Sequence, residues 1–356
     1  MDHKETNEAI ALLQQMIAIP SISKDETAVA DFLERFIEIN GYVASRTNNN
    51  VWVMSSGFDP SRPTVLLNSH IDTVKPVQGW TRNPLMPVIE NGKLYGLGSN
   101  DAGASVVSLL YAFFYLTQEQ QSYNLIYAAS AEEEISGENG MVSLLKELPK
   151  IDFAIVGEPT EMNLAVAEKG LMVLDCTVSG LAGHAARDEG ENAIYKAIRD
   201  IEWFRTFEYE KKSELLGKVK MTVTQITSGT QHNVIPDKCS FVVDVRSNEM
   251  YSNQEILEEI NKHVDCDVQS RSTRLSSTAT PLHHPIVKRG IELNRTLFGS
   301  PTLSDQSLMP FTSLKMGPGM SSRSHTADEY ILLSEIDEAI SLYVQLLDGL
   351  KLESRS

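Results

Sequence analysis

The chain has 356 residues, 42% of them hydrophobic, and a formal net charge of −17 at pH 7. This acidity disfavours nucleic acid and anionic membranes as partners, and no apolar run approaches membrane-spanning length. The three cysteines form no CxxC motif, and the polar N-terminus contains no secretory apolar segment. We therefore expect a soluble, cytoplasmic protein, and its length fits two domains.

The first 170 residues alternate between helical and strand patterns. Apolar residues at helical spacing predict helices at 5–19 and, after a capping box formed by Ser23 and Glu26, up to Gly41. Further helices are predicted at 104–116 and 140–148. Runs of branched residues predict strands at 51–54, 64–68, 124–130 and 152–156, and Asn91-Gly92 predicts a hairpin turn. This alternation indicates an α/β fold, a mostly parallel sheet with helices on both faces.

The pattern changes near residue 171. Strands are predicted at 171–178, 219–227, 239–246 and 267–275, and helices at 191–207 and 253–263. This β-α-β-β-α-β order is typical of the ferredoxin-like split. Helical spacing resumes at Pro285 and closes with a helix at 334–350. We therefore predict a catalytic domain of residues 1–170 and 281–356, interrupted by an inserted α+β domain of residues 171–280.

Imidazole and carboxylate side chains recur at predicted strand ends and glycine-rich loops of the interrupted domain. They are His70, Asp72, Asp101, Glu132, Glu133, Glu134, Glu158 and His325. Taken singly, each has an ordinary alternative: His-x-Asp can cap a strand, and an acidic triplet more often begins a solvated helix. Together they suit two divalent cations. The roughly four positive charges of two such ions would be offset by the negative carboxylates, and nitrogen and oxygen ligands suit zinc.

The ordered motifs Ser69-His70-Ile71-Asp72, Gly98-Ser99-Asn100-Asp101, Glu132-Glu133-Glu134, Val156-Gly157-Glu158-Pro159-Thr160 and Ser324-His325-Thr326 resemble a known family. It is the dinuclear zinc peptidase and deacylase family, with acetylornithine deacetylase, succinyl-diaminopimelate desuccinylase, aminoacylase and carboxypeptidase G. The resemblance implies that His70 and Glu158 bind one metal ion, that His325 and Glu134 bind the other, and that Asp101 bridges them. Zn²⁺ is expected, with Co²⁺ or Mn²⁺ as alternatives. Asp72 would orient His70.

The same resemblance makes Glu133 the general base, which takes a proton from water and delivers it to the leaving amine. The family usually has Asp-Glu-Glu where this chain has Glu132-Glu133-Glu134. Glu132 therefore remains a competing candidate for the base.

Candidates also lie in the inserted domain and in a late loop. By resemblance, His184 polarises the scissile carbonyl in the other subunit of a homodimer formed through the inserted domain. Asn233 and Arg246 would bind substrate, and a guanidinium suits a carboxylate, although a surface salt bridge is the alternative for Arg246. Gly317 and Gly319 could offer backbone N–H groups to a carboxylate, although a plain turn fits them nearly as well.

These features predict a metal-dependent amidohydrolase that removes an acyl group, preferably acetyl, from a small N-acyl amino acid. Within the family, the resemblance favours acetylornithine deacetylase and hence arginine biosynthesis. Deacylases of N-acetylcitrulline, N-succinyl-ornithine or -citrulline, or succinyl-diaminopimelate are alternatives. A metallo-dipeptidase or carboxypeptidase, or a non-catalytic binding protein of the same fold, are further alternatives.

Overall fold

The computed structural model describes residues 3–187 and 189–352. The chain forms two compact units. The first contains the chain up to Val166, Thr280–Phe298 and the chain from Ser304, and the second contains Ala167–Ala279 with Gly299–Leu303. The division falls within a few residues of the predicted boundaries at 170 and 281. The short segment Gly299–Leu303, which the sequence placed with the catalytic domain, belongs to the second unit.

A mixed sheet forms the centre of the first unit, and its strands follow in the order β1-β2-β6-β3-β7-β17-β8. The strands are β1 Ala44–Thr47, β2 Asn50–Met54, β3 Thr64–His70, β6 Asn124–Ser130, β7 Phe153–Val156, β8 Leu164–Glu168 and β17 Thr312–Lys315. The four central strands β6, β3, β7 and β17 are parallel. Their carboxyl ends therefore meet at one edge, where open α/β sheets bind ligands.

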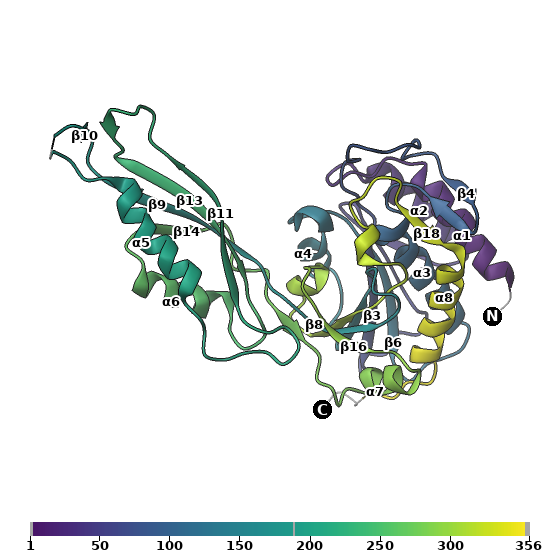
Figure 1. Ribbon diagram of the computed structural model, residues 1–356. Helices are drawn as coiled ribbons and strands as arrows, with labels where there is room; N and C mark the ends of the chain where they lie inside the picture. The colour runs from purple at the N-terminus through teal and green to yellow at the C-terminus, as the bar shows by residue number, and fades with distance from the viewer. Residues whose placement is uncertain (1–2, 188, 353–356) are drawn as a thin grey trace. The chain divides into compact units, whose positions relative to one another are not determined.

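Helices cover both faces of this sheet, which confirms the predicted α/β class (Figure 1). Alternate strand residues such as Leu67 and Tyr127 pack against one set of helices. These are α1 His3–Ile17, α2 Thr27–Ile39, α3 Ala104–Leu116, α7 Pro285–Glu292 and α8 Leu333–Leu347. The residues between them, such as Leu66 and Ile126, pack with the short helix α4 Met141–Leu144. Every residue of β3 and β6 is buried, as expected for parallel strands covered on both sides.

A small antiparallel sheet, β18-β5-β4, lies beside the glycine-rich loop. Its strands are β4 Val88–Glu90, β5 Lys93–Tyr95 and β18 Tyr330–Leu332. The predicted hairpin turn is confirmed, because Asn91 and Gly92 both have positive φ. Strand β5 leads directly into the short helical turn η1 Ser99–Gly103. Pairing of β18 with β5 therefore brings the segment after His325 next to the loop of Asp101.

The predicted capping box at the start of α2 is wrong. The residue before Thr27 is Glu26, and no side chain caps the helix. Ser23 instead donates its hydroxyl to Oδ2 of Asp72, at 2.7 Å. Glu26 is fully buried and accepts a hydrogen bond from the side chain of Asn49, at 2.9 Å. Ser23 thus bonds to a residue remote in sequence, and Glu26 bonds both to Asn49 and to the nearby N–H of Lys24, at 2.6 Å.

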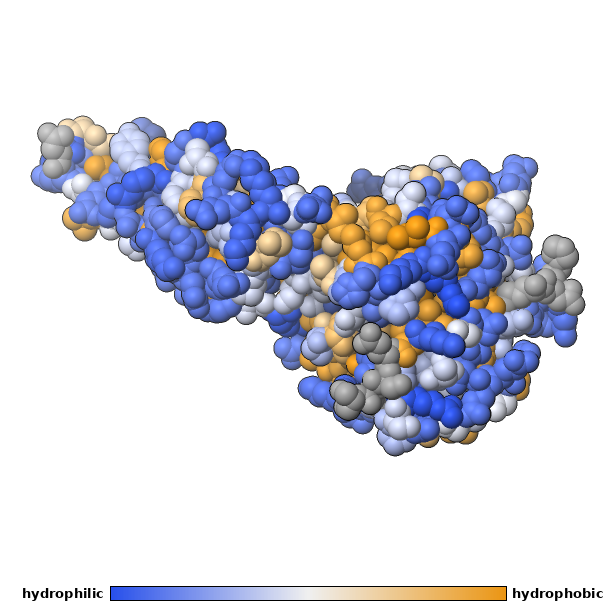
Figure 2. Space-filling view, turned by 90° about the horizontal axis from the view of Figure 1, so that it is seen from below, coloured by the Kyte–Doolittle hydropathy of each residue, from blue (hydrophilic) through white to orange (hydrophobic). Residues whose placement is uncertain are grey.

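The second unit has the predicted ferredoxin-like arrangement, with strand order β11-β13-β9-β14 and all pairs antiparallel. Its elements are β9 Met172–Ser179, β10 Gly183–His184, α5 Ala193–Thr206, β11 Lys220–Ser228, β12 Val234–Ile235, β13 Lys238–Arg246, α6 Asn253–His263, β14 Asp267–Ser270 and β15 Thr278–Ala279. A capping box of Ser252 and Glu255 begins α6. Its buried cluster lies between the sheet and the two helices, and its surface in Figure 2 is mainly hydrophilic.

The remaining elements are the β-strand β16 Leu297–Ser300 and the short 3₁₀ turns η2 Glu133–Ile135, η3 Asp305–Leu308 and η4 Ser321–Arg323. Across residues 3–187 and 189–352, no helix has both the length and the apolar character required to cross a bilayer.

Candidate metal centre

The first predicted ligand stands at the carboxyl end of β3. His70 is the last residue of that strand and is 2% exposed. Its Nδ1 lies 2.9 Å from the main-chain oxygen of Asp72 and 3.5 Å from Oδ1 of the same residue. This contact fixes the plane of the imidazole ring and leaves Nε2 directed at the acidic residues.

Asp72 also holds the acidic triplet in place. Its carboxylate accepts hydrogen bonds from the backbone N–H groups of Glu133 and Glu134, at 3.0 and 3.2 Å, and from the Ser23 hydroxyl. Burial opposes the charge of Asp72, but His70 and these donors keep its pKa below the usual range. Asp72 therefore joins the strand end of His70 to the segment of Glu133 and Glu134.

Two groups of metal-ligand atoms share Asp101. One comprises His70, Asp101 and Glu158, the other Asp101, Glu134 and His325, and within each group the ligand atoms lie within 4.8 Å of one another. Oδ1 of Asp101 is 3.2 Å from Nε2 of His70, and Oδ2 is 3.7 Å from Nε2 of His325. The two carboxylate oxygens of Asp101 thus face different groups.

The remaining distances complete both groups. Nε2 of His70 is 3.7 Å from Oε1 of Glu158, and Nε2 of His325 is 3.0 Å from Oε2 of Glu134. His70 is buried, whereas the side chain of His325 is 50% exposed. One group therefore lies deep in the protein and the other reaches its surface.

The buried carboxylates of the two donor groups carry negative charge that bound cations would balance. Burial is the largest cause that raises the pKa of Glu134, and burial raises the pKa of Glu158 to about 8. His70 opposes both shifts, while neighbouring carboxylates add to them. Buried carboxylates so close together repel one another unless positive charge is added. Imidazole nitrogen with carboxylate oxygen is a donor set that suits zinc and related divalent ions.

Glu133 lies beside the first group. Its Oε2 is 4.0 Å from Nε2 of His70, yet Glu133 belongs to neither group of donors. Burial, together with Glu158 and Asp305, raises its pKa well above the usual range, although His70 opposes the shift. A carboxylate near the metal donors but outside both sets has the position required of a general base.

Glu132, the competing candidate for the base, faces away from this site. Its carboxylate accepts hydrogen bonds from the backbone N–H and the side-chain amide of Asn139, at 3.2 and 3.0 Å. Its backbone has positive φ, and its N–H donates to Glu26 at 3.3 Å. These contacts support a role for Glu132 in shaping the loop and favour Glu133 as the base.

Asp305 is a buried residue near the site to which the sequence analysis gave no role. Its Oδ2 accepts hydrogen bonds from Asn68 at 3.0 Å and from the hydroxyl of Ser130 at 2.6 Å. Both partners lie on β-strands that end at the site, β3 and β6. Burial raises the pKa of Asp305 to about 6, against the hydrogen bonds from Ser130 and Asn68. No local sequence pattern indicated this position, because both partners of Asp305 are remote in sequence.

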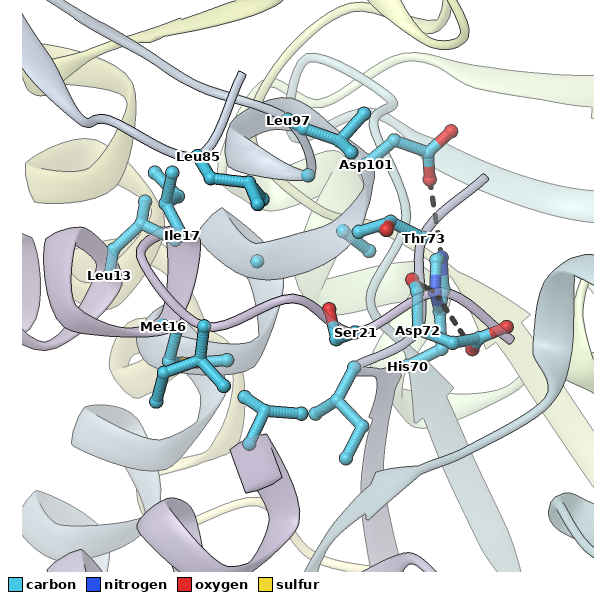
Figure 3. A pocket seen from close by; sticks show the side chains of 16 residues that line it. Leu13, Met16, Ile17, Ser21, His70, Asp72, Thr73, Leu85, Leu97 and Asp101 are labelled. Atoms are coloured by element: carbon cyan, nitrogen blue, oxygen red, sulfur yellow. Dashed lines mark hydrogen bonds and ion pairs between the residues drawn. The ribbon is translucent and has the colours of Figure 1, made fainter. Parts of the chain in front are cut away.

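A small cavity lies behind His70, Asp72 and Asp101 (Figure 3). Leu13 and Ile17 are among the apolar residues on its other side. Its volume is about 20 Å³, which accommodates roughly one water molecule. A substrate must therefore approach the donors from another direction, and the exposed side of His325 provides one.

The three predicted residues of the inserted domain lie in the second unit. His184 on β10 is exposed, and its Nδ1 accepts a hydrogen bond from the N–H of Ala186. The main-chain oxygen of Asn233 accepts from the N–H of Ala185, at 3.0 Å, so His184 and Asn233 are neighbours. Arg246 lies apart at the end of β13 and pairs with Asp244, at 2.9 and 3.1 Å. Its substrate role stays a prediction, in competition with this ion pair.

The loop of Gly317 and Gly319 packs closely against the first unit's site. The N–H of Gly317 donates to Oγ1 of Thr160 at 3.0 Å, so this N–H already has a partner within the protein. A Cβ at Gly317 would lie 2.5 Å from the main-chain oxygen of Glu158, and one at Gly319 would lie 2.2 Å from Oδ1 of Asn100. Close packing therefore accounts for both glycines without a ligand, and the substrate-binding roles of Gly317 and Gly319 stay predictions.

Metal binding is expected to release protons from this site near neutral pH. A Glu158 carboxyl with a pKa of about 8 is mainly protonated there, and Asp101 and Asp72 keep the pKa of His70 well above its usual value despite burial. Both groups must lose a proton before they bind a cation. Titration calorimetry with Zn²⁺ in buffers of different ionisation enthalpy measures the release. Glu158→Gln should release about one proton fewer, and equal release from both proteins would contradict this assignment.

Comparisons with known proteins identify the family of the chain. Residues 66–349 match the model of peptidase family M20/M25/M40. A protein of Mycobacterium tuberculosis (strain ATCC 25618 / H37Rv), provisionally named succinyl-diaminopimelate desuccinylase, is 29% identical over 96% of this chain and 98% of its own length. The succinyl-diaminopimelate desuccinylase of Delftia acidovorans is 22% identical over 96% of this chain and 98% of its own length.

Solved structures share the fold. The aminopeptidase PepT of Bacillus cereus has a TM-score of 0.80 at 16% identity, covering 97% of this chain and 98% of its own. The YXEP protein of Bacillus subtilis, described as a dinuclear metal binding peptidase, has a TM-score of 0.74 at 15% identity, with the same coverage. The family match spans most of the sequence and includes every metal donor identified above. The chain belongs to peptidase family M20/M25/M40.

Proposed function

We propose that the protein is a metal-dependent amidohydrolase that removes an acyl group from an N-acyl amino acid. One observation carries this proposal: two groups of nitrogen and oxygen donors share the carboxylate of Asp101, with Glu133 beside them. His70 and Glu158 would hold one divalent cation, and Glu134 and His325 the other, with Asp101 shared. Two such ions, when bound, would lower the pKa of a water molecule and polarise the amide carbonyl.

Glu133 performs the proton transfers in this proposal. Its burial beside three other acidic residues favours the protonated form, and bound cations would favour the charged form. The carboxylate can then accept a proton from water and return it to the amide nitrogen as the carbon–nitrogen bond breaks. Asp72 keeps Glu133 in reach of the reaction through the backbone hydrogen bond to its N–H.

The substrate is proposed from the relatives. Two curated relatives that align over almost the whole chain carry the name succinyl-diaminopimelate desuccinylase. Their names favour an N-succinyl amino acid, which was one of the alternatives, over the N-acetylornithine that the motifs first suggested. N-acetylornithine remains the second candidate, since both reactions break the same kind of amide bond.

A substrate panel distinguishes these candidates. The protein, loaded with Zn²⁺, Co²⁺ or Mn²⁺, is assayed with N-succinyl-diaminopimelate, N-acetylornithine, N-acetylcitrulline, N-succinyl-ornithine and a set of dipeptides. We expect one acylated amino acid to be hydrolysed with the highest kcat/KM, and activity to vanish after chelation and return with metal. Preference for dipeptides would support the peptidase alternative. Failure to hydrolyse any of them, with metal bound, would support a non-catalytic protein.

The second unit is proposed to contribute to substrate binding in a homodimer. His184 would stabilise the oxyanion that develops on the carbonyl, and Asn233 and Arg246 would contact the substrate. The exposure of His184 supports this role, because the imidazole is accessible from solvent even though its Nδ1 accepts a hydrogen bond from the N–H of Ala186. Dimer formation through residues 171–280 and a cytoplasmic location are part of the same proposal.

A further inference from the structure

The carboxylate of Glu329 holds the loop that carries Asp101. Glu329 is 3% exposed. Its Oε1 accepts hydrogen bonds from the N–H groups of Asn100 and Asp101, at 2.8 and 2.9 Å, and its Oε2 accepts from the N–H of Gly98, at 3.0 Å. One buried side chain therefore binds three backbone donors within four consecutive residues.

The fold brings these residues together over a long distance in sequence. Strand β18 pairs with β5 so that Tyr330 lies opposite Tyr95. Glu329 precedes β18 and Gly96 follows β5, and the N–H of Gly96 donates to the main-chain oxygen of Glu329 at 3.0 Å. The backbone of Glu329 thus continues the sheet, while its side chain reaches the next turn of the loop.

We propose that Glu329 is a positioning residue, which fixes Asp101 between the two groups of donors and so couples the binding of the two metal ions. This role of Glu329 rests on one part of the proposed function, namely that Asp101 is a ligand of both metal ions. Two of the three hydrogen bonds restrain Asn100 and Asp101 directly. The carboxylate of Asp101 faces His70 with one oxygen and His325 with the other, so a shift of this backbone disturbs both groups.

Asp328 offers a matched control. It is the adjacent carboxylate and also accepts three hydrogen bonds, from the N–H and hydroxyl of Thr81 and from the N–H of Arg82. The loop that it holds carries none of the metal donors. Glu329 and Asp328 therefore make similar bonds to two different loops, and only that of Glu329 contains Asp101.

The first test compares metal binding by Glu329→Gln, Glu329→Asp and Asp328→Asn with that of the wild-type chain. Glutamine keeps the length of the side chain but presents one N–H₂ group to the N–H donors, and aspartate keeps the charge but is too short. We expect competition with a chelator to show both Zn²⁺ affinities reduced roughly 10- to 100-fold in each Glu329 variant, as for other residues that orient ligands. Asp328→Asn should keep the wild-type affinities.

A purely structural role would give a different result. The melting temperature of Glu329→Gln would then fall while both metal affinities stayed at the wild-type values, and that outcome would overturn the proposal. The Co²⁺ absorption spectrum provides a second readout, since it reports ligand geometry, and we expect it to change in Glu329→Gln and not in Asp328→Asn.

Hydrogen exchange of the wild-type chain is a second test, and it requires neither bound metal nor a folded variant. In the metal-free wild-type chain, hydrogen exchange resolved to single amides should show Gly98, Asn100 and Asp101 protected. Rapid exchange at these three amides would overturn the proposal. If the wild-type chain binds no pair of ions, the proposed function fails, while the exchange result still decides whether Glu329 holds this loop.

Discussion

Asp101→Asn is expected to abolish hydrolysis and to weaken the binding of both metal ions. Asparagine has almost the same shape as aspartate but is neutral and has a single oxygen, so it cannot face both His70 and His325 as the two oxygens of Asp101 do. We expect each metal affinity to fall by more than about 100-fold, the upper range for residues that only orient ligands. Competition titrations with a chelator and assays of the metal-loaded enzyme measure both effects.

Asp31→Asn is a suitable control for this variant. Asp31 is an exposed aspartate on α2 that pairs with Arg46, at 2.9 Å, and the variant should bind metal and turn over substrate as the wild type does, because exposed ion pairs contribute little. If Asp101→Asn lost one metal ion and bound the other with the wild-type affinity, Asp101 would be a ligand of one ion and not of both.

Glu133→Gln is expected to reduce kcat by about 10²- to 10⁴-fold, the range typical of a lost general base. Metal content should stay at the wild-type value, because Glu133 belongs to neither donor group. Glutamine is close to glutamate in size but cannot take up a proton. Steady-state kinetics and metal analysis of the same preparation provide the two values.

Glu132→Gln decides between the two candidates for the base. Its carboxylate bonds to Asn139, so this variant should lose thermal stability and keep most of its activity. If Glu132→Gln were as inactive as expected for Glu133→Gln, while Glu133→Gln stayed active, the assignment of the base would have to be exchanged.

The sequence was sufficient to predict many elements of both units and the convergence of the donors, although it missed strands such as β1 and β8. Parallel strands such as β3 and β6 are buried throughout, have an apolar centre and end in polar residues, and the carboxyl ends of parallel strands meet at one edge of a sheet. A motif at each of several strand ends therefore predicts a shared site. Local patterns indicate the shared site, whereas the resemblance to a known family assigned His70, Glu158 and Asp101 to one metal ion, and the structure brings the donor atoms of these three residues together.

The supporting contacts could not be predicted in this way. Ser23 and Glu26 have the spacing of a capping box, yet Ser23 binds Asp72 and Glu26 binds Asn49. Glu329 bonds to donors 228 to 231 positions away, and nothing in a local pattern indicates such a partner. Buried polar side chains must find partners wherever the fold supplies them, and these partners follow from tertiary packing alone.

The central claim, that two cations share the carboxylate of Asp101, is tested most directly by diffraction. A crystal of the Zn²⁺-loaded protein, measured on both sides of the zinc absorption edge, reveals each ion by its anomalous signal. We predict two peaks, one contacted by His70, Glu158 and Asp101 and the other by His325, Glu134 and Asp101. A single peak, or two peaks of which one lacks contact with Asp101, would contradict the account.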